Sequence, residues 1–165
     1  MAFVRKKKIK GKEYAYLVEN KWTEKGSRQK VKAYLGKVLM FPQVKNLELK
    51  ESEKKDEFIK NLVEWELLKH GFEKQGNLFV QNNVKVLFEN NKLKLDDSDV
   101  EPAFAFNEGY LCNYFLDQLF SLKLEKKDKQ KPKTMMKVAK LFVNSGINIP
   151  QEAFIKFYDA IFMHK

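Results

Sequence analysis

The side chains with the clearest chemical potential are the lysines, arginines and tyrosines near the beginning of the chain. Residues 1–37 contain 12 Lys and Arg residues against 3 Glu residues, a net charge of +9. The other 128 residues contain 20 basic and 19 acidic side chains, so nearly all of the net charge of +10 lies in this first segment. Positive charge with interleaved aromatic rings is typical of surfaces that bind the phosphates of nucleic acid and stack its bases.

Three β-strands are predicted to position these side chains. Gly11-Lys12 and Lys25-Gly26 indicate two tight hairpin turns, because glycine accepts the positive φ that such turns require. The first strand would precede these turns, and the other two would run from about 13 to 23 and from about 28 to 40. Phe41-Pro42 would end the third strand, since proline cannot extend a ladder.

The expected pairing sorts the side chains onto two faces. With Lys25-Gly26 as a two-residue loop, Trp22 lies opposite Gln29 and Tyr16 opposite Leu35; in the first hairpin Lys6 lies opposite Leu17. Because side chains alternate along a strand, one face would turn toward the core with Tyr14, Tyr16, Val18, Trp22, Val31, Ala33 and Leu35. The other face would carry the predicted nucleic-acid-binding residues, which are Lys6, Lys8, Lys21, Arg28, Lys30, Lys32 and Tyr34.

The composition of this basic face favours contact with the phosphate backbone of RNA or DNA over base reading. The chain has only two Arg residues, and arginine is the preferred bidentate reader of bases. Two other interpretations stay open: a solvated face that keeps the sheet from aggregating, and a surface for an acidic protein partner. A second basic stretch, Lys123 to Lys140, has 8 Lys against 2 acids and is either another nucleic-acid contact or a solubilising loop.

A resemblance to prokaryotic transposases of the IS4/IS1634 type is carried by Ile9-Lys10-Gly11-Lys12-Glu13-Tyr14-Ala15-Tyr16-Leu17-Val18-Glu19, Arg28-Gln29-Lys30-Val31 and Tyr34-Leu35-Gly36-Lys37. It covers the N-terminal β segment, about residues 1–37, and implies nucleic acid as the partner of that segment. It does not imply transposition, which needs three metal-binding carboxylates in a longer RNase H-like domain. A resemblance to a group of small archaeal proteins covers most of the chain through Leu67-Leu68-Lys69-His70-Gly71-Phe72 and Asn107-Glu108-Gly109-Tyr110-Leu111, and implies no activity.

Residues 42–101 predict a helix followed by an antiparallel meander. The helix would begin after Ser52 as N-cap and end near His70, before Gly71. Apolar and polar residues then alternate through three strands, at 78–80, 84–88 and 93–95. A short strand at 72–74 could precede them. Asn82-Asn83 and Asn90-Asn91 would form the turns, because asparagine tolerates left-handed backbone geometry.

Residues 102–165 predict a short apolar strand or connector at Phe104 and Phe106, followed by three helices. The first would run from Glu108 to about Leu122 with Asn107 as cap, the second over 134–144, and the third from Pro150 to about Phe162. The fold class is therefore α+β, with a basic three-stranded antiparallel sheet, a linking helix, a β-meander and three C-terminal helices. The predicted units are 1–41, 42–101 and 102–165, of which the last two would form one domain.

No catalytic motif stands out, so we expect no enzyme, no metal and no cofactor. The chain has two His residues and one Cys, without zinc-ligand spacing, a phosphate loop or a nucleophile elbow. The acidic residues Asp96, Asp97, Asp99 and Glu101 lack the spacing of a calcium loop and indicate a solvated turn. His70 is interpreted as a helix cap, and Cys112 as a buried, inert thiol.

The sequence also leaves an alternative function. No segment approaches the roughly 18 apolar residues of a membrane helix, and no secretory leader is evident, so a cytoplasmic protein is expected. The C-terminal helices are rich in aromatic residues and could form a protein-interaction or homodimer surface. In that case the basic sheet would only solubilise the protein or dock an acidic partner.

Overall fold

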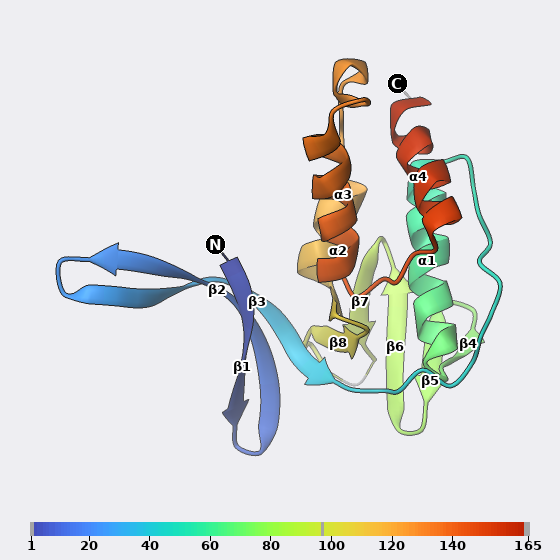
Figure 1. Ribbon diagram of the computed structural model, residues 1–165. Helices are drawn as coiled ribbons and strands as arrows, with labels where there is room; N and C mark the ends of the chain where they lie inside the picture. The colour runs from blue at the N-terminus through green and yellow to red at the C-terminus, as the bar shows by residue number, and fades with distance from the viewer. Residues whose placement is uncertain (1, 97, 164–165) are drawn as a thin grey trace.

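The α+β class is confirmed, but the first sheet has five strands rather than three (Figure 1). The structure is a computed structural model that describes residues 2–96 and 98–163. The first sheet has the order β1 (Ala2–Ile9), β2 (Lys12–Thr23), β3 (Gly26–Leu39), β8 (Pro102–Phe106) and β9 (Gly109–Cys112). The second sheet has the order β4 (Glu73–Gln75), β5 (Leu78–Gln81), β6 (Val84–Glu89) and β7 (Lys92–Leu95). The α-helices are α1 (Lys55–Lys69), α2 (Asn113–Phe120), α3 (Pro132–Asn144) and α4 (Gln151–Met163).

The two additional strands join the N-terminal sheet through a parallel pair. Val38 of β3 lies opposite Ala103 of β8, and β9 returns antiparallel to β8. Gly36 makes this junction possible, because its φ is +138° and a Cβ atom there would lie 2.6 Å from the carbonyl oxygen of Glu101. The Lys37 N–H donates a 2.8 Å hydrogen bond to the same oxygen. The N-terminal strands are thus joined to the rest of the molecule by close contact and hydrogen bonding between the backbones of β3 and the segment that begins β8.

The predicted helix from Glu108 to Leu122 is wrong over its first part. Asn107 does not cap a helix; its φ of +53° places it in the turn between β8 and β9. Residues 109–112 form a strand, and α2 starts only at Asn113. A Cβ at Gly109 would lie 2.0 Å from the carbonyl oxygen of Val143, so the strand and α3 approach closely at this glycine. A segment that is apolar on all sides fits a buried strand as well as a buried helix.

The second sheet is the predicted meander, including its short first strand. Asn82, Asn90 and Asn91 adopt φ values of +53°, +53° and +62°, as the predicted turns require. The linking helix α1 also forms, but Ser52 is not its N-cap. The Ser52 hydroxyl oxygen accepts a hydrogen bond from the Lys54 N–H outside the helix, which begins at Lys55.

The α-helices pack against one another in a closed ring of contacts. Helix α1 contacts α2 and α4, and α3 contacts the same two helices. Helix α3 has Pro132 in its first turn, and α4 begins directly after Pro150, close to the predicted starts. Buried aromatic rings fill the interior; for example, the ring centroids of Phe58 and Phe157 are 5.5 Å apart. Among the described residues, no helix is long and apolar enough to cross a bilayer.

Asn113 links the two sheets, which remain separate hydrogen-bonded units. Its side-chain oxygen accepts a 2.7 Å hydrogen bond from the Leu93 N–H, and its amide group donates a 2.9 Å bond to the Leu93 carbonyl oxygen. The side chain thus takes the place of a neighbouring strand at the edge of β7. The preceding residue, Cys112, is fully buried as predicted, and burial raises the pKa of its thiol to about 12.

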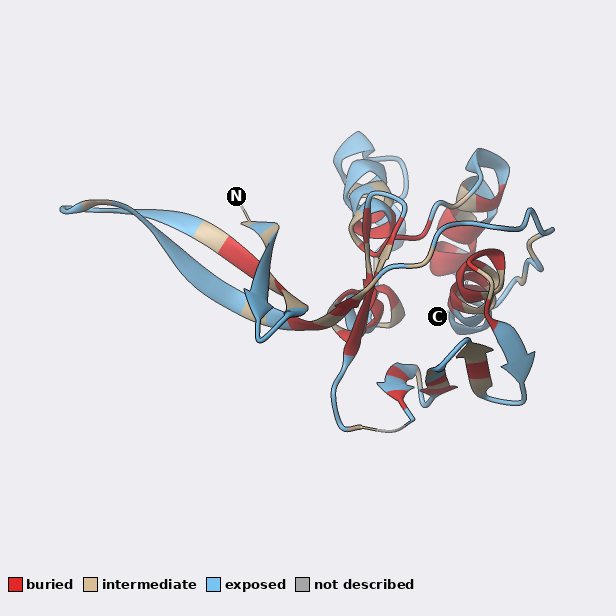
Figure 2. Cartoon of the chain, turned by 90° about the horizontal axis from the view of Figure 1, so that it is seen from below, coloured by how far each residue is buried: buried red, intermediate tan, exposed pale blue. Residues whose placement is uncertain are grey.

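The hairpin of β2 and β3 extends beyond the end of β1 as a two-stranded ribbon. We call residues 20–29 the arm, because β1 pairs with β2 only as far as Glu19. The side chains of the arm are exposed, apart from partly covered Gly26. Figure 2 shows the arm extending away from the body, and Figure 1 shows that it projects away from the helices. The arm carries Lys21, Lys25 and Arg28 against Glu24, so it places part of the positive charge of residues 1–37 at a highly accessible position.

Candidate nucleic-acid interface

Both N-terminal hairpin turns lie one residue earlier than predicted. Ile9 pairs with Lys12, so the first turn is Lys10-Gly11, and Thr23 pairs with Gly26, so the second turn is Glu24-Lys25. The ladder in the arm is consequently shifted by two residues from the predicted register. Trp22, for example, lies opposite Ser27 rather than Gln29. A shift of two residues preserves the alternation of side chains between the two faces.

Two irregularities in the ladder change the faces nearer the body. β3 has an extra residue opposite the step from Ala15 to Tyr16 and another opposite the step from Leu17 to Val18. These extra residues are Leu35 and Lys32. Bulges of this kind redirect the side chains that follow them. Tyr34 consequently lies directly opposite Tyr16 and not with the basic side chains of the arm.

The predicted assignment of core face and outer face is wrong for part of the sheet, although Val18 and Leu35 of the predicted core face are buried. Ala15 and Leu17, which were expected on the basic face, are buried in the main core. Trp22 and Val31, which were expected in the core, are 86% and 47% exposed. The positions above the core take small or aliphatic side chains. Aromatic side chains with a polar group suit a surface that is partly in water.

The structure brings four of the predicted site residues together along the arm and its base. Lys21 lies directly opposite Arg28, and Lys30 lies opposite Glu19 on the same side of the ladder. Lys21 also lies near Glu19, with 3.7 Å between its Nζ and a carboxylate oxygen. Lys32 is exposed on the bulge next to this group. One acidic side chain therefore stands among four cations, and the local charge stays strongly positive.

The other predicted residues lie elsewhere on the sheet. Lys6 and Lys8 are exposed on β1 near the first turn, where Lys8 lies opposite Glu13 and Lys6 approaches Glu13 at 3.8 Å. Tyr34 is 42% exposed on the opposite face. The predicted set is thus divided into two basic groups and one tyrosine on the other side of the sheet.

Tyr34 belongs to a surface that the sequence analysis did not identify. We call it the tyrosine face, and its members are Arg5, Lys7, Tyr14, Tyr16 and Tyr34. The ring centroid of Tyr34 is 5.3 Å from that of Tyr16 and 6.5 Å from that of Tyr14. The Nζ atom of Lys7 lies 5.1 Å from the Tyr16 ring centroid, a cation–π arrangement.

The electrostatics of the tyrosine face keep Tyr34 neutral. Partial burial raises the pKa of its hydroxyl, and the neighbouring Tyr16 and Tyr14 raise it further. A neutral hydroxyl can donate a hydrogen bond as well as accept one. Arg5, opposite Tyr16, donates a hydrogen bond to the side-chain oxygen of Gln29 at the base of the arm. The face therefore offers fixed cations beside aromatic rings.

A signal for the tyrosine face was present in the sequence. Tyr14 and Tyr16 flank Ala15, so both rings must lie on one side of β2 and the small residue on the other. Arg5 and Lys7 have the same spacing on β1. The apolar rings of Tyr14 and Tyr16 predict a core position, whereas the small side chain of Ala15 between them fits the core better.

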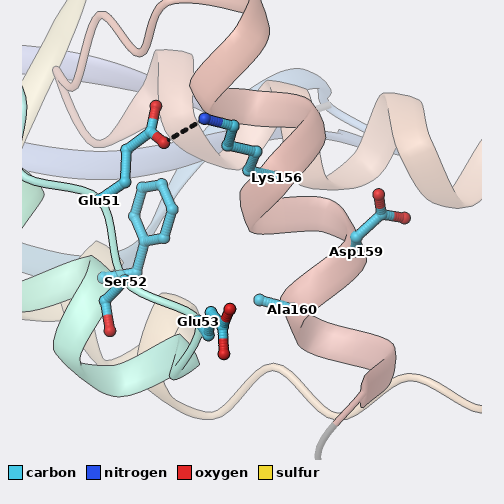
Figure 3. A pocket seen from close by; sticks show the side chains of 7 residues that line it. Glu51, Ser52, Glu53, Lys156, Asp159 and Ala160 are labelled. Atoms are coloured by element: carbon cyan, nitrogen blue, oxygen red, sulfur yellow. Dashed lines mark hydrogen bonds and ion pairs between the residues drawn. The ribbon is translucent and has the colours of Figure 1, made fainter.

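A cavity of about 400 Å³ lies between the connector before α1 and helix α4 (Figure 3). Its charged groups are largely neutralised within the protein. Lys156 bonds to a Glu51 carboxylate oxygen at 2.5 Å, and this bond raises the pKa of the lysine. Asp159 forms an ion pair of 2.9 Å with Lys129. These pairs join the connector, α4 and the loop before α3, which is a structural role.

A second polar group is buried where α1 meets the turn between β8 and β9. Glu66 is fully buried and accepts hydrogen bonds from Lys69 Nζ at 3.1 Å, the Asn148 N–H at 2.9 Å and Asn107 Nδ2 at 3.3 Å. His70 is the C-cap of α1, but burial lowers its pKa, although contact with Glu66 opposes this effect. The ring is therefore a neutral packing element rather than the charged cap that was expected. It stacks on Phe106, with 3.8 Å between ring centroids.

The acidic residues after β7 show no metal-binding arrangement within the described part of the chain. Among these residues, no three His, Cys, Asp or Glu side chains are grouped as metal ligands. Asp99 pairs with Lys94 at 3.6 Å, and Asp97 lies outside the described residues.

Comparison of the chain with known protein families, curated proteins and solved structures finds no match. The resemblances of residues 1–37 to transposases and of most of the chain to small archaeal proteins therefore stay interpretations of the sequence.

Proposed function

We propose that the protein is a non-catalytic nucleic-acid-binding protein. It would hold RNA or DNA on its N-terminal sheet and arm, mainly through contacts between lysine or arginine side chains and phosphates. The observation that supports this most directly is the net charge of +9 within residues 1–37, a segment that includes the exposed arm. Such a surface would attract a polyanion over a long range.

The construction of the arm supports a polyanionic partner. A two-stranded ribbon without a third strand has marginal stability in water. In this arm Lys21 faces Arg28, so two like charges also repel each other across the ladder. Phosphates between and around these side chains would remove the repulsion. The arm is therefore better suited to a bound state than to the free protein.

The aromatic side chains support nucleic acid over a merely solvated basic surface. A surface whose only task is solubility gains nothing from a tryptophan that is 86% exposed. Trp22 lies on the same side of β2 as Tyr14 and Tyr16, because all three are an even number of residues apart. Rings beside cations fit bases attached to phosphates.

The test is the affinity for a fluorescently labelled oligonucleotide of mixed sequence, measured by anisotropy at increasing salt. Binding should weaken steeply and linearly on a log–log scale, because phosphate contacts release counterions. The double variant Lys30→Glu with Lys32→Glu should abolish binding. The control, Lys85→Glu with Lys94→Glu, changes the net charge equally on the second sheet and should retain binding. Weak binding whose affinity does not change with salt concentration, or wild-type affinity in the Lys30→Glu, Lys32→Glu variant, would contradict the proposal.

The C-terminal helices support a second candidate, a homodimer or protein-interaction surface. Met136 and Val143 are exposed on one side of α3, seven residues apart, and Ile155 is exposed on α4. Apolar side chains gathered at the surface are typical of interfaces. Light scattering after size exclusion would show a dimer, and Met136→Glu should convert it to a monomer. A monomer at all concentrations would rule out this homodimer.

A further inference from the structure

We infer that the preferred ligand is single-stranded nucleic acid, whose unpaired bases stack on the tyrosine face. This inference rests on the proposed function and adds the class of nucleic acid to it. Tyr34, Tyr16 and Tyr14 would contact bases, while Arg5 and Lys7 would contact the phosphates attached to them.

The first support is that the three rings lie outside the core. Among the described residues, the apolar core is built without Tyr14, Tyr16 and Tyr34, although they lie on the two central strands of this part of the sheet. The rings contact one another at centroid distances of 5.3 and 6.5 Å, and Tyr34 remains 42% exposed. They are thus held in place by one another and still present surface to solvent. A preformed aromatic platform of this kind loses little conformational entropy on binding.

The second support is the chemistry of bases in different nucleic acids. In a duplex each base is stacked between its neighbours, so a side chain on a sheet meets only edges and backbone. In single strands and loops the bases can turn outward and stack on aromatic side chains. Rings arranged on an open sheet surface are therefore matched to unpaired bases. Each such stack contributes about 1–3 kcal/mol, with little dependence on the base.

The third support is the position of the cations relative to the rings. Lys7 Nζ lies 5.1 Å from the Tyr16 ring centroid, and Arg5 occupies the β1 position directly opposite Tyr16. A phosphate bound by either side chain would place its nucleotide beside the tyrosines. Further along the same side of β2, Trp22 lies six residues from Tyr16, which is about 20 Å in an extended strand. The aromatic side chains thus form a track along one strand, which suits a linear ligand.

A duplex is the competing ligand, because a two-stranded ribbon such as the arm could enter a major groove. That arrangement would use Lys21 and Arg28 but would leave the tyrosine face without a role. The exposed ring of Tyr34, its neutral hydroxyl and the Lys7 ammonium group beside the Tyr16 ring favour the single strand.

The experiment compares two labelled probes at equal salt: a 20-nucleotide oligo(dT) and a DNA hairpin duplex with the same number of phosphates. The full-length protein should bind oligo(dT) at least tenfold more tightly. Tyr34→Leu, which keeps an apolar side chain but removes the ring, should weaken oligo(dT) binding about 5- to 150-fold, the range that corresponds to one lost stack. The same variant should leave duplex binding unchanged, and Tyr34→Phe should bind both probes like the wild type.

The outcomes separate the inference from the proposed function. Equal or tighter binding of the duplex by the wild type would overturn the single-strand inference and leave nucleic-acid binding intact. So would a Tyr34→Leu variant that retains its circular dichroism and weakens both probes equally. Binding of neither probe would refute the proposed function itself. The wild-type preference needs no variant, so the inference stays testable even if Tyr34→Leu does not fold.

Discussion

Lys21 lies directly opposite Arg28 near the tip of the arm, so two positive side chains face each other across the β2–β3 ladder. On the same side of the ladder, at the base of the arm, Glu19 lies opposite Lys30. The tip therefore carries a repulsive pair and the base an attractive one. Arg28 and Lys30, two cations on the same side of β3, consequently have opposite effects on the stability of the free arm.

Arg28→Glu is expected to stabilise the arm and weaken binding. The substitution gives Lys21 an opposite charge as its partner, which favours the ladder by about 0.2–1 kcal/mol. It also removes two units of positive charge from the binding surface, so the affinity for an oligonucleotide should fall. Hydrogen exchange of the arm amides measures the first effect, and fluorescence anisotropy measures the second.

Lys30→Glu is the matched variant. It removes the same charge but places a glutamate opposite Glu19, so the arm amides should exchange faster than in the wild type. The oligonucleotide affinity should fall in both variants. Equal exchange rates of the arm amides in the Arg28→Glu and Lys30→Glu variants would contradict the observed register of the arm.

Glu66→Ala should destabilise the whole body of the protein by about 3–5 kcal/mol, because it leaves buried Lys69 without its carboxylate partner. The control Glu64→Ala breaks the partly exposed pair of Glu64 with Lys74 and should cost less than about 1 kcal/mol. Both substitutions replace glutamate by alanine within α1, so the change in helix propensity is the same and cannot cause a difference between the two variants. Urea denaturation followed by tryptophan fluorescence gives both values, and similar losses would contradict the role assigned to the buried group.

His70 should make the protein less stable in mild acid. Burial lowers its pKa in the folded state, so the unfolded chain binds the proton more readily. The free energy of unfolding should therefore fall as the pH drops below the usual histidine value of about 6.5, and the loss should be complete below the folded pKa. In His70→Gln this dependence should be reduced. Parallel curves for the two proteins, measured by urea denaturation between pH 7.5 and 5, would show that His70 does not contribute.

Gly36→Ala should destabilise the junction of β3 and β8 by more than about 3 kcal/mol, the upper end for a strained backbone position. The new methyl group would meet the backbone of Glu101 and Pro102 at 2.6 and 2.8 Å. Gly11→Ala is the control: its φ of +79° is also unfavourable for alanine, but a Cβ there has open space. That variant should lose only about 1–2 kcal/mol. Thermal unfolding of the two proteins measures the difference, and equal losses would contradict the close approach.

The second sheet could be predicted because its determinants are local. Strict alternation and paired asparagines at the turns are read within a few residues of each other, as at Asn90-Asn91. The pairing of β8 with β3 could not be predicted, because the parallel partner of β8 is more than 60 residues away in the sequence. The strand β9 was predicted as helix. Nothing near Gly109 indicates that α3 will press against it.

The candidate interface was predictable in charge but not in geometry. The cluster of lysines follows from composition, whereas the outward side of Tyr16 depends on where the body lies. The place of Tyr34 opposite Tyr16 depends on the bulges at Lys32 and Leu35. Tyrosine is compatible with either environment, because it has an apolar ring and a polar hydroxyl. The small side chain of Ala15 between Tyr14 and Tyr16 was the more informative residue.

The seam between β3 and β8 has a further consequence. β8, with the sequence Pro-Ala-Phe-Ala-Phe, is hydrogen-bonded to β3 on one side and β9 on the other. Removing residues 1–39 would convert it into an apolar edge strand, a template for self-association between copies of the chain. The N-terminal strands thus cover an edge that would otherwise promote aggregation. Loss of solubility in a chain without residues 1–39 would therefore follow from the exposed edge and would not be evidence about a ligand.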